Sequence, residues 1–225
     1  MIDNMTDGVR TITLQREPKN TVDLVTIQTL TALFETHPSS VPLVLTGANG
    51  VFSAGVDARA FMGYSGDERL EMARAITRMT AALLAIPSPV VAAVTGHALG
   101  GGLVMALCCD YRVVTNREDA KFGLLEGKAG IAFPSGPAAI VQAEVPAGLM
   151  RKLTLSSRMI SGAELVQHAV FDESVDDELV LERAQAFALE LSAQSGFCAV
   201  KEQMRGELRD HLAHLVVLGV EAAFS

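Results

Sequence analysis

The sequence predicts an α/β fold in which strands and helices alternate first and helices alone follow. Strand-like and helix-like runs alternate up to about residue 137, and the pattern from residue 138 onward is helical. The 225 residues are 49% hydrophobic and 20% charged, which is typical of a globular chain with a sizeable core. No internal repeat interrupts this order. We therefore expect a core in residues 1–145 and a helical region in residues 146–225.

The first predicted elements are two strands with a helix between them. Residues 8–15 alternate as a half-buried strand does, and residues 41–45 form a short apolar run of the kind found in buried strands. A polar loop covers residues 16–20. Asp23 is a good N-cap for the helix that follows. The apolar face of that helix carries residues at helical spacing, Leu24, Ile27, Leu30 and Leu33.

The middle of the chain adds a loop, a long helix and another strand. Residues 46–57 are rich in Gly, Asn and Ser and predict a loop. Residues 66–86 predict a helix with Met72, Ile76, Met79 and Leu83 on one face, ended by the prolines that follow. The β-branched run at 90–95 predicts a buried strand.

A turn at 96–99 then leads into three glycines and an apolar helix at 103–109. A strand at 110–115 and an irregular glycine-rich stretch at 124–137 follow. The remaining helices are predicted over 138–144, 147–155, 161–168, 177–194 and 198–223.

Composition excludes several classes of function. The formal net charge of −8 argues against a nucleic-acid-binding protein. No apolar run is long enough to span a membrane, and the first residues do not form a signal peptide, so we expect a cytoplasmic protein without a membrane partner. Cys108, Cys109 and Cys198 lie in apolar surroundings and are interpreted as reduced core thiols. No cluster has the spacing of metal ligands, so we expect no metal site.

The three glycines are the first candidate for chemistry. Glycine is a poor helix former, so Gly100, Gly101 and Gly102 at a helix start require a reason. Unpaired N–H groups at a helix start can face an oxygen that gains negative charge, provided that no side chain intervenes. Close packing alone is the alternative. The spacing fits neither a dinucleotide-binding loop nor a P-loop.

A second candidate is the segment at 52–57, whose small residues would let another backbone N–H face a ligand. An ordinary loop is the alternative. The third candidate is Glu126, which lies among Phe122, Leu124, Leu125 and Ile131. Burial there would raise its pKa and suit a general acid or base. A solvated loop glutamate is the alternative.

Together these segments resemble the crotonase (enoyl-CoA hydratase/isomerase) superfamily. The matching pieces are VLTGANGVFSAGVD at 44–57, SPVVAAVTGHALGGG at 88–102, CDYRVV at 109–114 and KFGLLEGKAGIAFP at 121–134. The resemblance implies a ββα spiral core that carries an acyl-CoA site in residues 1–145. It also implies a C-terminal helical trimerisation region, and hence a homotrimer or a dimer of trimers.

The resemblance also implies site residues. The N–H groups of Val56 and Gly101 would form an oxyanion hole for the carbonyl of an acyl-CoA thioester. Arg16 and Lys19 would lie near the phosphates of coenzyme A. The residues implied to bind substrate are Ser53, Ala54, Gly55, Val56, Asp57 and Gly101.

The carboxylates favour one subgroup. Hydratases of this superfamily use two glutamates, and the position of the first is occupied by Val104. The position of the second glutamate is occupied by Glu126. A single glutamate at this position resembles the pattern of the Δ3,Δ2-enoyl-CoA isomerases. Glu126 would move a proton from C2 to C4 through an enolate, without a cofactor. Hydration, thioester hydrolysis, decarboxylation and non-catalytic acyl-CoA binding stay open. His97 and Asp110 are interpreted as structural, and Tyr64 as a possible ligand contact.

Overall fold

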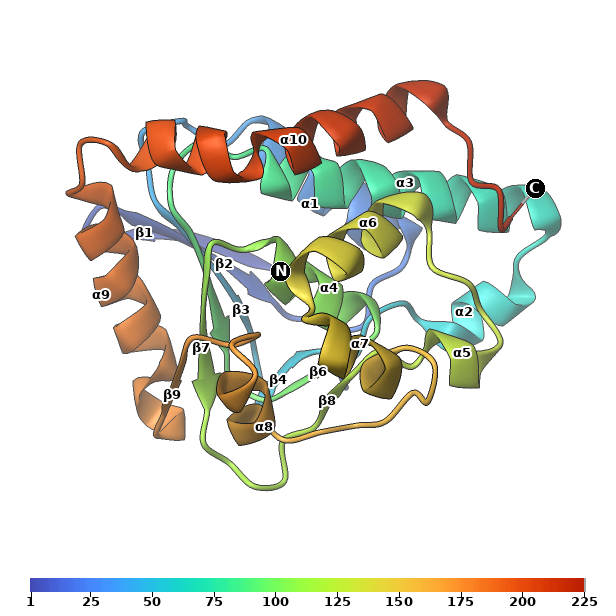
Figure 1. Cartoon of the computed structure of the whole chain (residues 1–225), viewed down its shortest axis with the longest axis horizontal. Helices are drawn as coiled ribbons and strands as arrows, with labels where there is room; N and C mark the ends of the chain where they lie inside the picture. The colour runs from blue at the N-terminus through green and yellow to red at the C-terminus, as the bar shows by residue number, and fades with distance from the viewer. Residues whose placement is uncertain (225) are drawn as a thin grey trace.

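A computed structural model describes residues 1–224, and for residues 58 and 59 it describes the backbone alone. A six-stranded sheet forms the centre of the molecule, in the order β1-β2-β3-β5-β7-β9 (Figure 1). β1 and β2 are antiparallel, and the remaining neighbours are parallel. The strands are β1 (Ile2–Thr6), β2 (Val9–Leu14), β3 (Leu43–Gly47), β5 (Val90–Val94), β7 (Tyr111–Thr115) and β9 (Glu173–Val175).

A second, three-stranded parallel sheet is made of shorter strands in the order β4-β6-β8. Its members are β4 (Val51–Ser53), β6 (His97–Leu99) and β8 (Phe122–Gly123). Each of them follows a strand of the large sheet along the chain, after β3, β5 and β7 respectively. The chain therefore passes repeatedly from the large sheet to the small one and then into a helix, as the predicted ββα spiral requires.

Both faces of the central strands β3 and β5 are buried. On β3, Leu43 and Leu45 join the main hydrophobic core, whereas Val44 points to the other face and packs with α9 (Val180–Ser192). This period of two is the normal alternation of a strand. The main core is covered by α1 (Leu24–Glu35), α3 (Gly66–Leu84) and α4 (Gly101–Cys108). The predicted α/β fold is confirmed.

The remaining helices lie mostly in the second half of the chain. α10 (Phe197–Leu218) runs alongside α3 across one side of the molecule (Figure 1). No helix among the described residues combines the length and apolar character needed to cross a membrane. The other elements are α2 (Ala58–Gly63), α5 (Glu126–Ala129), α6 (Ser135–Glu144), α7 (Ala147–Leu153), α8 (Gly162–Gln167) and a short 3-10 helix η1 (Asp177–Leu179).

Several sequence predictions require correction. β1 was not predicted, because its residues are exposed and lack an apolar face. β9 adds a strand to the region predicted to be helical alone. β4 and β6 lie where the sequence predicts a loop and a turn, because a strand of three residues shows no readable period. Cys108 and Cys109 are buried free thiols as predicted, but Cys198 is exposed on α10.

Candidate active site

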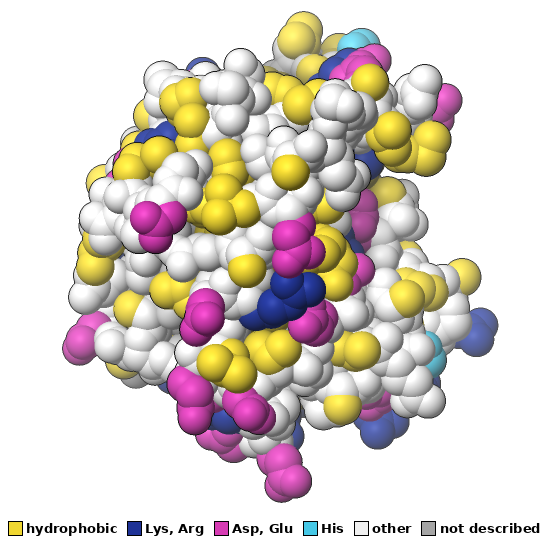
Figure 2. Space-filling view, turned by 90° about the vertical axis from the view of Figure 1, so that its left-hand side faces the viewer, with side chains coloured by type: hydrophobic (Ala, Val, Ile, Leu, Met, Phe, Trp, Pro, Cys, Tyr) yellow, Lys and Arg dark blue, Asp and Glu magenta, His cyan; other side chains and the backbone are white. Residues whose placement is uncertain are grey.

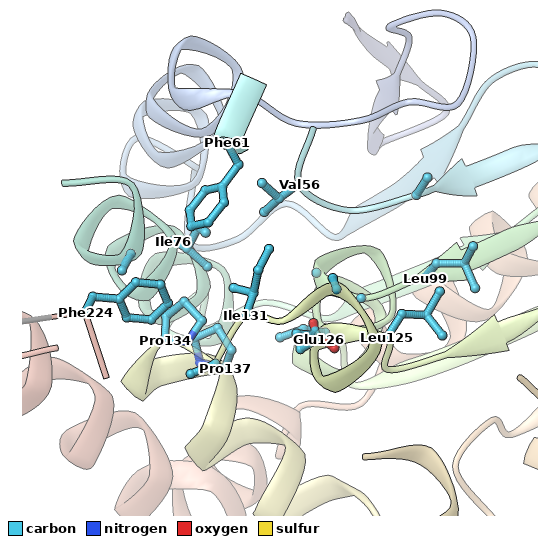
Figure 3. A pocket seen from close by; sticks show the side chains of 17 residues that line it. Val56, Phe61, Ile76, Leu99, Leu125, Glu126, Ile131, Pro134, Pro137 and Phe224 are labelled. Carbon is cyan, nitrogen blue, oxygen red and sulfur yellow. The ribbon is translucent and has the colours of Figure 1, made fainter. Parts of the chain in front are cut away.

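A cavity of about 230 Å³ lies between the two glycine-rich loops, α3, α5 and the start of α6 (Figure 3). Its wall is almost entirely apolar. Within the described part of the chain, Glu126 is the one charged side chain that lines it. The other lining residues are Ala54, Val56, Phe61, Ala73, Ile76, Leu99, Gly100, Gly101, Val104, Leu125, Ala129, Ile131, Ala132, Pro134, Pro137 and Phe224.

Two backbone N–H groups face this cavity from separate segments. Val22 donates its N–H to Gly55 O at 2.8 Å and accepts from the N–H of Asp57 at 3.0 Å, in a parallel bridge to Val56. Such a bridge leaves the N–H of Val56 on the side away from Val22. Gly101 is the first residue of α4, and its N–H has no acceptor within the helix. Within residues 1–224, neither N–H donates to a protein acceptor.

The two segments approach so closely that side chains would separate them. A Cβ added to Gly55, whose φ is +76°, would lie 2.9 Å from Gly101 N and 2.7 Å from Leu99 O. A Cβ added to Gly102 would lie 2.2 Å from Ser53 O. A Cβ on Gly101 would lie 4.0 Å from Val56 N. The glycines therefore bring two free N–H groups side by side, which is the arrangement of an oxyanion hole.

Glu126 begins α5 and places its carboxylate beside the glycine triplet. A Cβ on Gly100 would lie 3.3 Å from Glu126 Oε1. The other oxygen, Oε2, is shielded from solvent and has no hydrogen-bond partner among the described residues. Burial in this apolar wall raises the pKa of Glu126 to about 7. Glu126 can therefore both release and accept a proton near neutral pH.

The position that could hold a second carboxylate is apolar. Val104 is 1% exposed and lines the same cavity from α4. Its side chain can exclude water but cannot transfer a proton. The cavity thus places a pair of N–H groups that lack protein acceptors near a single carboxylate in apolar surroundings.

The predicted substrate-binding residues divide into two groups. Ala54 and Val56 line the cavity, and Gly55 lies behind them against Gly101. Ser53 is fully buried instead, and its hydroxyl donates to Asn20 O at 2.7 Å, so it shapes the loop. Asp57 caps α2 by accepting from the N–H of Ala60 at 3.2 Å.

The basic residues before α1 are held differently from each other. Arg16 makes ion pairs with Asp23 at 3.2 Å and with Asp57 at 3.1 Å, so its charge is already balanced. Lys19 is exposed to solvent. Within residues 1–224, Lys19 makes no ion pair, so of these two cations it is the one that is open to an anion from solvent.

Comparison with known proteins identifies the family. The family model described as enoyl-CoA hydratase/isomerase matches residues 4–221. The chain belongs to the enoyl-CoA hydratase/isomerase family. The human protein named enoyl-CoA hydratase domain-containing protein 2, mitochondrial, is 32% identical over 174 residues, which cover 75% of this chain and 59% of that protein. The probable enoyl-CoA hydratase EchA17 of Mycobacterium tuberculosis is 36% identical over 148 residues, covering 65% and 55%. The chain therefore matches less than two thirds of the length of these relatives.

Solved structures of the enoyl-CoA hydratase/isomerase family share the fold. An enoyl-CoA hydratase/isomerase family protein from Pseudomonas syringae superposes with a TM-score of 0.87 at 21% identity, covering 96% of this chain and 94% of that one. An apo enoyl-CoA isomerase of Mycobacterium tuberculosis gives a TM-score of 0.86 at 23% identity, covering 97% and 96%. The crotonase-like architecture is thereby confirmed.

The sequence motifs of the enoyl-CoA hydratase/isomerase family do not account for every residue that lines this cavity. Phe61 of α2 and Phe224 after α10 line the cavity, although neither belongs to a motif. Tyr64 lies behind Phe61, with 6.2 Å between ring centroids, and does not line the cavity. His97 accepts a hydrogen bond from the N–H of Lys121 at 2.9 Å, which agrees with the structural interpretation.

Proposed function

We propose that the protein is a Δ3,Δ2-enoyl-CoA isomerase. The observation that carries the proposal is the single carboxylate of Glu126 in an otherwise apolar cavity, next to the free N–H groups of Val56 and Gly101. Family membership supports an acyl-CoA thioester as substrate. One base with a pKa of about 7 suits a reaction that removes one proton and returns one proton.

In the proposed reaction, Glu126 takes a proton from C2 of a 3-enoyl-CoA. The electron pair of the C–H bond spreads into the thioester as a dienolate, whose oxygen accepts hydrogen bonds from Val56 and Gly101. Protonated Glu126 then returns the proton at C4, which gives the conjugated 2-enoyl-CoA. The atoms and electrons balance without a metal or redox cofactor. Each oxyanion-hole donor contributes on the order of 3 kcal/mol to such a barrier.

The relatives give a second candidate, because EchA17 carries the name of a probable enoyl-CoA hydratase. Hydration would need a water molecule held and activated beside the double bond. Val104 offers no group that could hold it, which favours isomerisation. Thioester hydrolysis and decarboxylation need differently placed groups, and the single carboxylate does not exclude them all. A non-catalytic acyl-CoA-binding protein would have no need for the carboxylate of Glu126.

Turnover of a 3-enoyl-CoA, followed by the absorbance of the conjugated product, tests the proposal. Wild type, Glu126→Gln and the exposed control Glu118→Gln should be compared, with acyl-CoA binding measured on each by calorimetry. We expect Glu126→Gln to lose turnover by at least about a hundredfold and to keep binding, whereas Glu118→Gln matches wild type. Equal turnover in wild type and Glu126→Gln would contradict the mechanism. Binding without any turnover in wild type would favour the non-catalytic function.

We further propose that the protein assembles as a homotrimer or a dimer of trimers. Exposed apolar side chains on α9 and α10 support an interface there, among them Leu189, Val200 and Met204. Figure 2, which views the side that carries α9 in Figure 1, shows apolar patches with acidic side chains between them. Light scattering on the purified protein would measure the mass, and a monomer would contradict the proposal.

A further inference from the structure

Residues 219–224 connect the end of α10 to the cavity. Gly219 ends α10 with a φ of +60°, a left-handed conformation that favours glycine. The carbonyl of Gly219 accepts from Arg74 Nε at 2.7 Å, and that of Val220 accepts from Ser135 Oγ at 3.3 Å. The segment is thus bonded to α3 on one side and to α6 on the other.

Glu221 fixes the centre of this segment. Its side chain is 3% exposed, and its two oxygens accept hydrogen bonds from Thr77 Oγ at 2.5 Å and from the N–H of Ser135 at 2.7 Å. Thr77 Oγ also accepts from the N–H of Gly136 at 3.2 Å. The carboxylate therefore lies at the positive end of α6, where negative charge is favoured.

Glu221 in turn places Phe224. The N–H of Phe224 donates to Glu221 O at 2.8 Å, and the ring lines the cavity. Figure 3 shows Phe224 with Pro134 and Ile76 at one end of the cavity and Leu99 at the other, with Glu126 between them. An acyl group that begins at the oxyanion hole and passes Glu126 would meet the ring of Phe224.

We propose that Phe224 is a specificity-determining residue that limits the length of the acyl group, and that Glu221 is its positioning residue. The inference rests on the proposed function, because it assumes an acyl-CoA in this cavity. The volume of about 230 Å³ is below the roughly 300 Å³ at which sites for larger small molecules begin. The substrate class is therefore acyl-CoA thioesters with short acyl chains.

Saturated acyl-CoAs test the inference without requiring turnover. Each methylene that enters an apolar cavity is expected to tighten acyl-CoA binding about fourfold. Methylenes beyond the point where the chain meets Phe224 should not increase the affinity further. Calorimetry with butyryl-, hexanoyl-, octanoyl- and decanoyl-CoA measures this dependence on chain length. The variants are Phe224→Ala, Glu221→Ala and Glu221→Gln. Val220→Ala is the matched control, because Val220 is 57% exposed and does not line the cavity.

We expect the ratio of decanoyl to butyryl affinity to be at least about tenfold larger in Phe224→Ala than in wild type. Glu221→Ala should shift the ratio in the same direction, since Phe224 is no longer held. Glu221→Gln should restore the wild-type ratio, because an amide can accept from Ser135 and donate to Thr77. Val220→Ala should match wild type. Circular dichroism on every variant establishes that it is folded.

The outcomes separate the inference from the proposed function. If wild type binds the series and Phe224→Ala keeps the wild-type ratio, the inference is overturned while the proposed function stands. If wild type binds no acyl-CoA of any length, both fail. If binding shifts as expected but no 3-enoyl-CoA is turned over, the role of Phe224 stands and the isomerase activity does not.

Discussion

The carboxylate of Glu126 lies directly against the backbone of Gly100. A Cβ on Gly100 would be 3.3 Å from Glu126 Oε1, and the φ of Gly100 is +53°, where side chains are strained. Gly100 therefore has two reasons to be glycine. The turn into α4 requires its conformation, and a Cβ would press against the carboxylate, which would have to shift by a few tenths of an ångström.

Gly100→Ala is expected to displace Glu126 and to lower kcat at least about tenfold, because small misplacements of a catalytic group are costly. Binding of a saturated acyl-CoA should fall much less. Gly8→Ala is the matched control, since Gly8 has a φ of +82° with open space around it. Steady-state kinetics on both variants measures the effect. Equal losses of kcat would show that backbone strain, and not the carboxylate, explains the result.

The raised pKa of Glu126 predicts how turnover depends on pH. The base must be ionised, so kcat/KM should rise with pH and level off above about 7. At about pH 5 only about 1% of a group with that pKa is ionised, so activity should be about a hundredfold below the plateau. A pH profile on wild type measures this. A profile that is flat between about pH 5 and about pH 8 would mean that the carboxyl has an ordinary pKa.

The same burial predicts a pH-dependent gain in stability for Glu126→Gln. The folded-state pKa of about 7 exceeds the ordinary value of 4.5, so the folded protein binds more protons than the unfolded chain between these values. The free energy of unfolding of wild type should therefore fall as pH rises through this window, by up to about 3 kcal/mol. The side chain in Glu126→Gln does not titrate, so the free energy of unfolding of this variant should not fall for this reason.

Denaturant unfolding of wild type and Glu126→Gln at about pH 5 and about pH 8 checks this difference. The variant should match wild type at the lower pH, where Glu126 is largely neutral, and exceed it at the higher pH. Glu118→Gln provides the exposed control. A variant that is less stable than wild type at both values would contradict the burial of the charge.

Helices, buried strands and motif residues could be predicted from the sequence, whereas very short strands and contacts between residues far apart in the chain could not. β3 and β5 follow from short apolar runs, and α3 follows from apolar residues at helical spacing. Val56, Gly101 and Glu126 could be placed from the motifs around them. Phe224 could not be assigned to the cavity, because its position depends on the buried carboxylate of Glu221 meeting α3 and α6. That contact joins residues more than eighty positions apart, and no local pattern encodes it.

Asp110 connects α10 to the large sheet. It accepts from the N–H of Val90 at 2.8 Å, from Lys201 Nζ at 2.5 Å and from Arg205 at 2.9 Å, and its side chain is 8% exposed. Arg205 also donates to the carbonyl of Cys108 at 3.0 Å. These contacts agree with the structural interpretation of Asp110, since its carboxylate binds one backbone N–H and two cations from α10.

Removing this carboxylate should destabilise the fold strongly. Asp110→Ala leaves the largely buried Lys201 without its carboxylate, leaves Arg205 with Glu144 as its remaining carboxylate and leaves one backbone N–H unpaired. Breaking a buried ion pair in this way costs about 3–5 kcal/mol. Asp119→Ala is the control, because its pair with Arg117 is exposed and such pairs contribute about 0–1 kcal/mol. Denaturant unfolding measures both changes. Equal losses in the two variants would mean that the Asp110 cluster is solvated, whereas a large loss in Asp110→Ala alone would show that it holds α10 against the sheet.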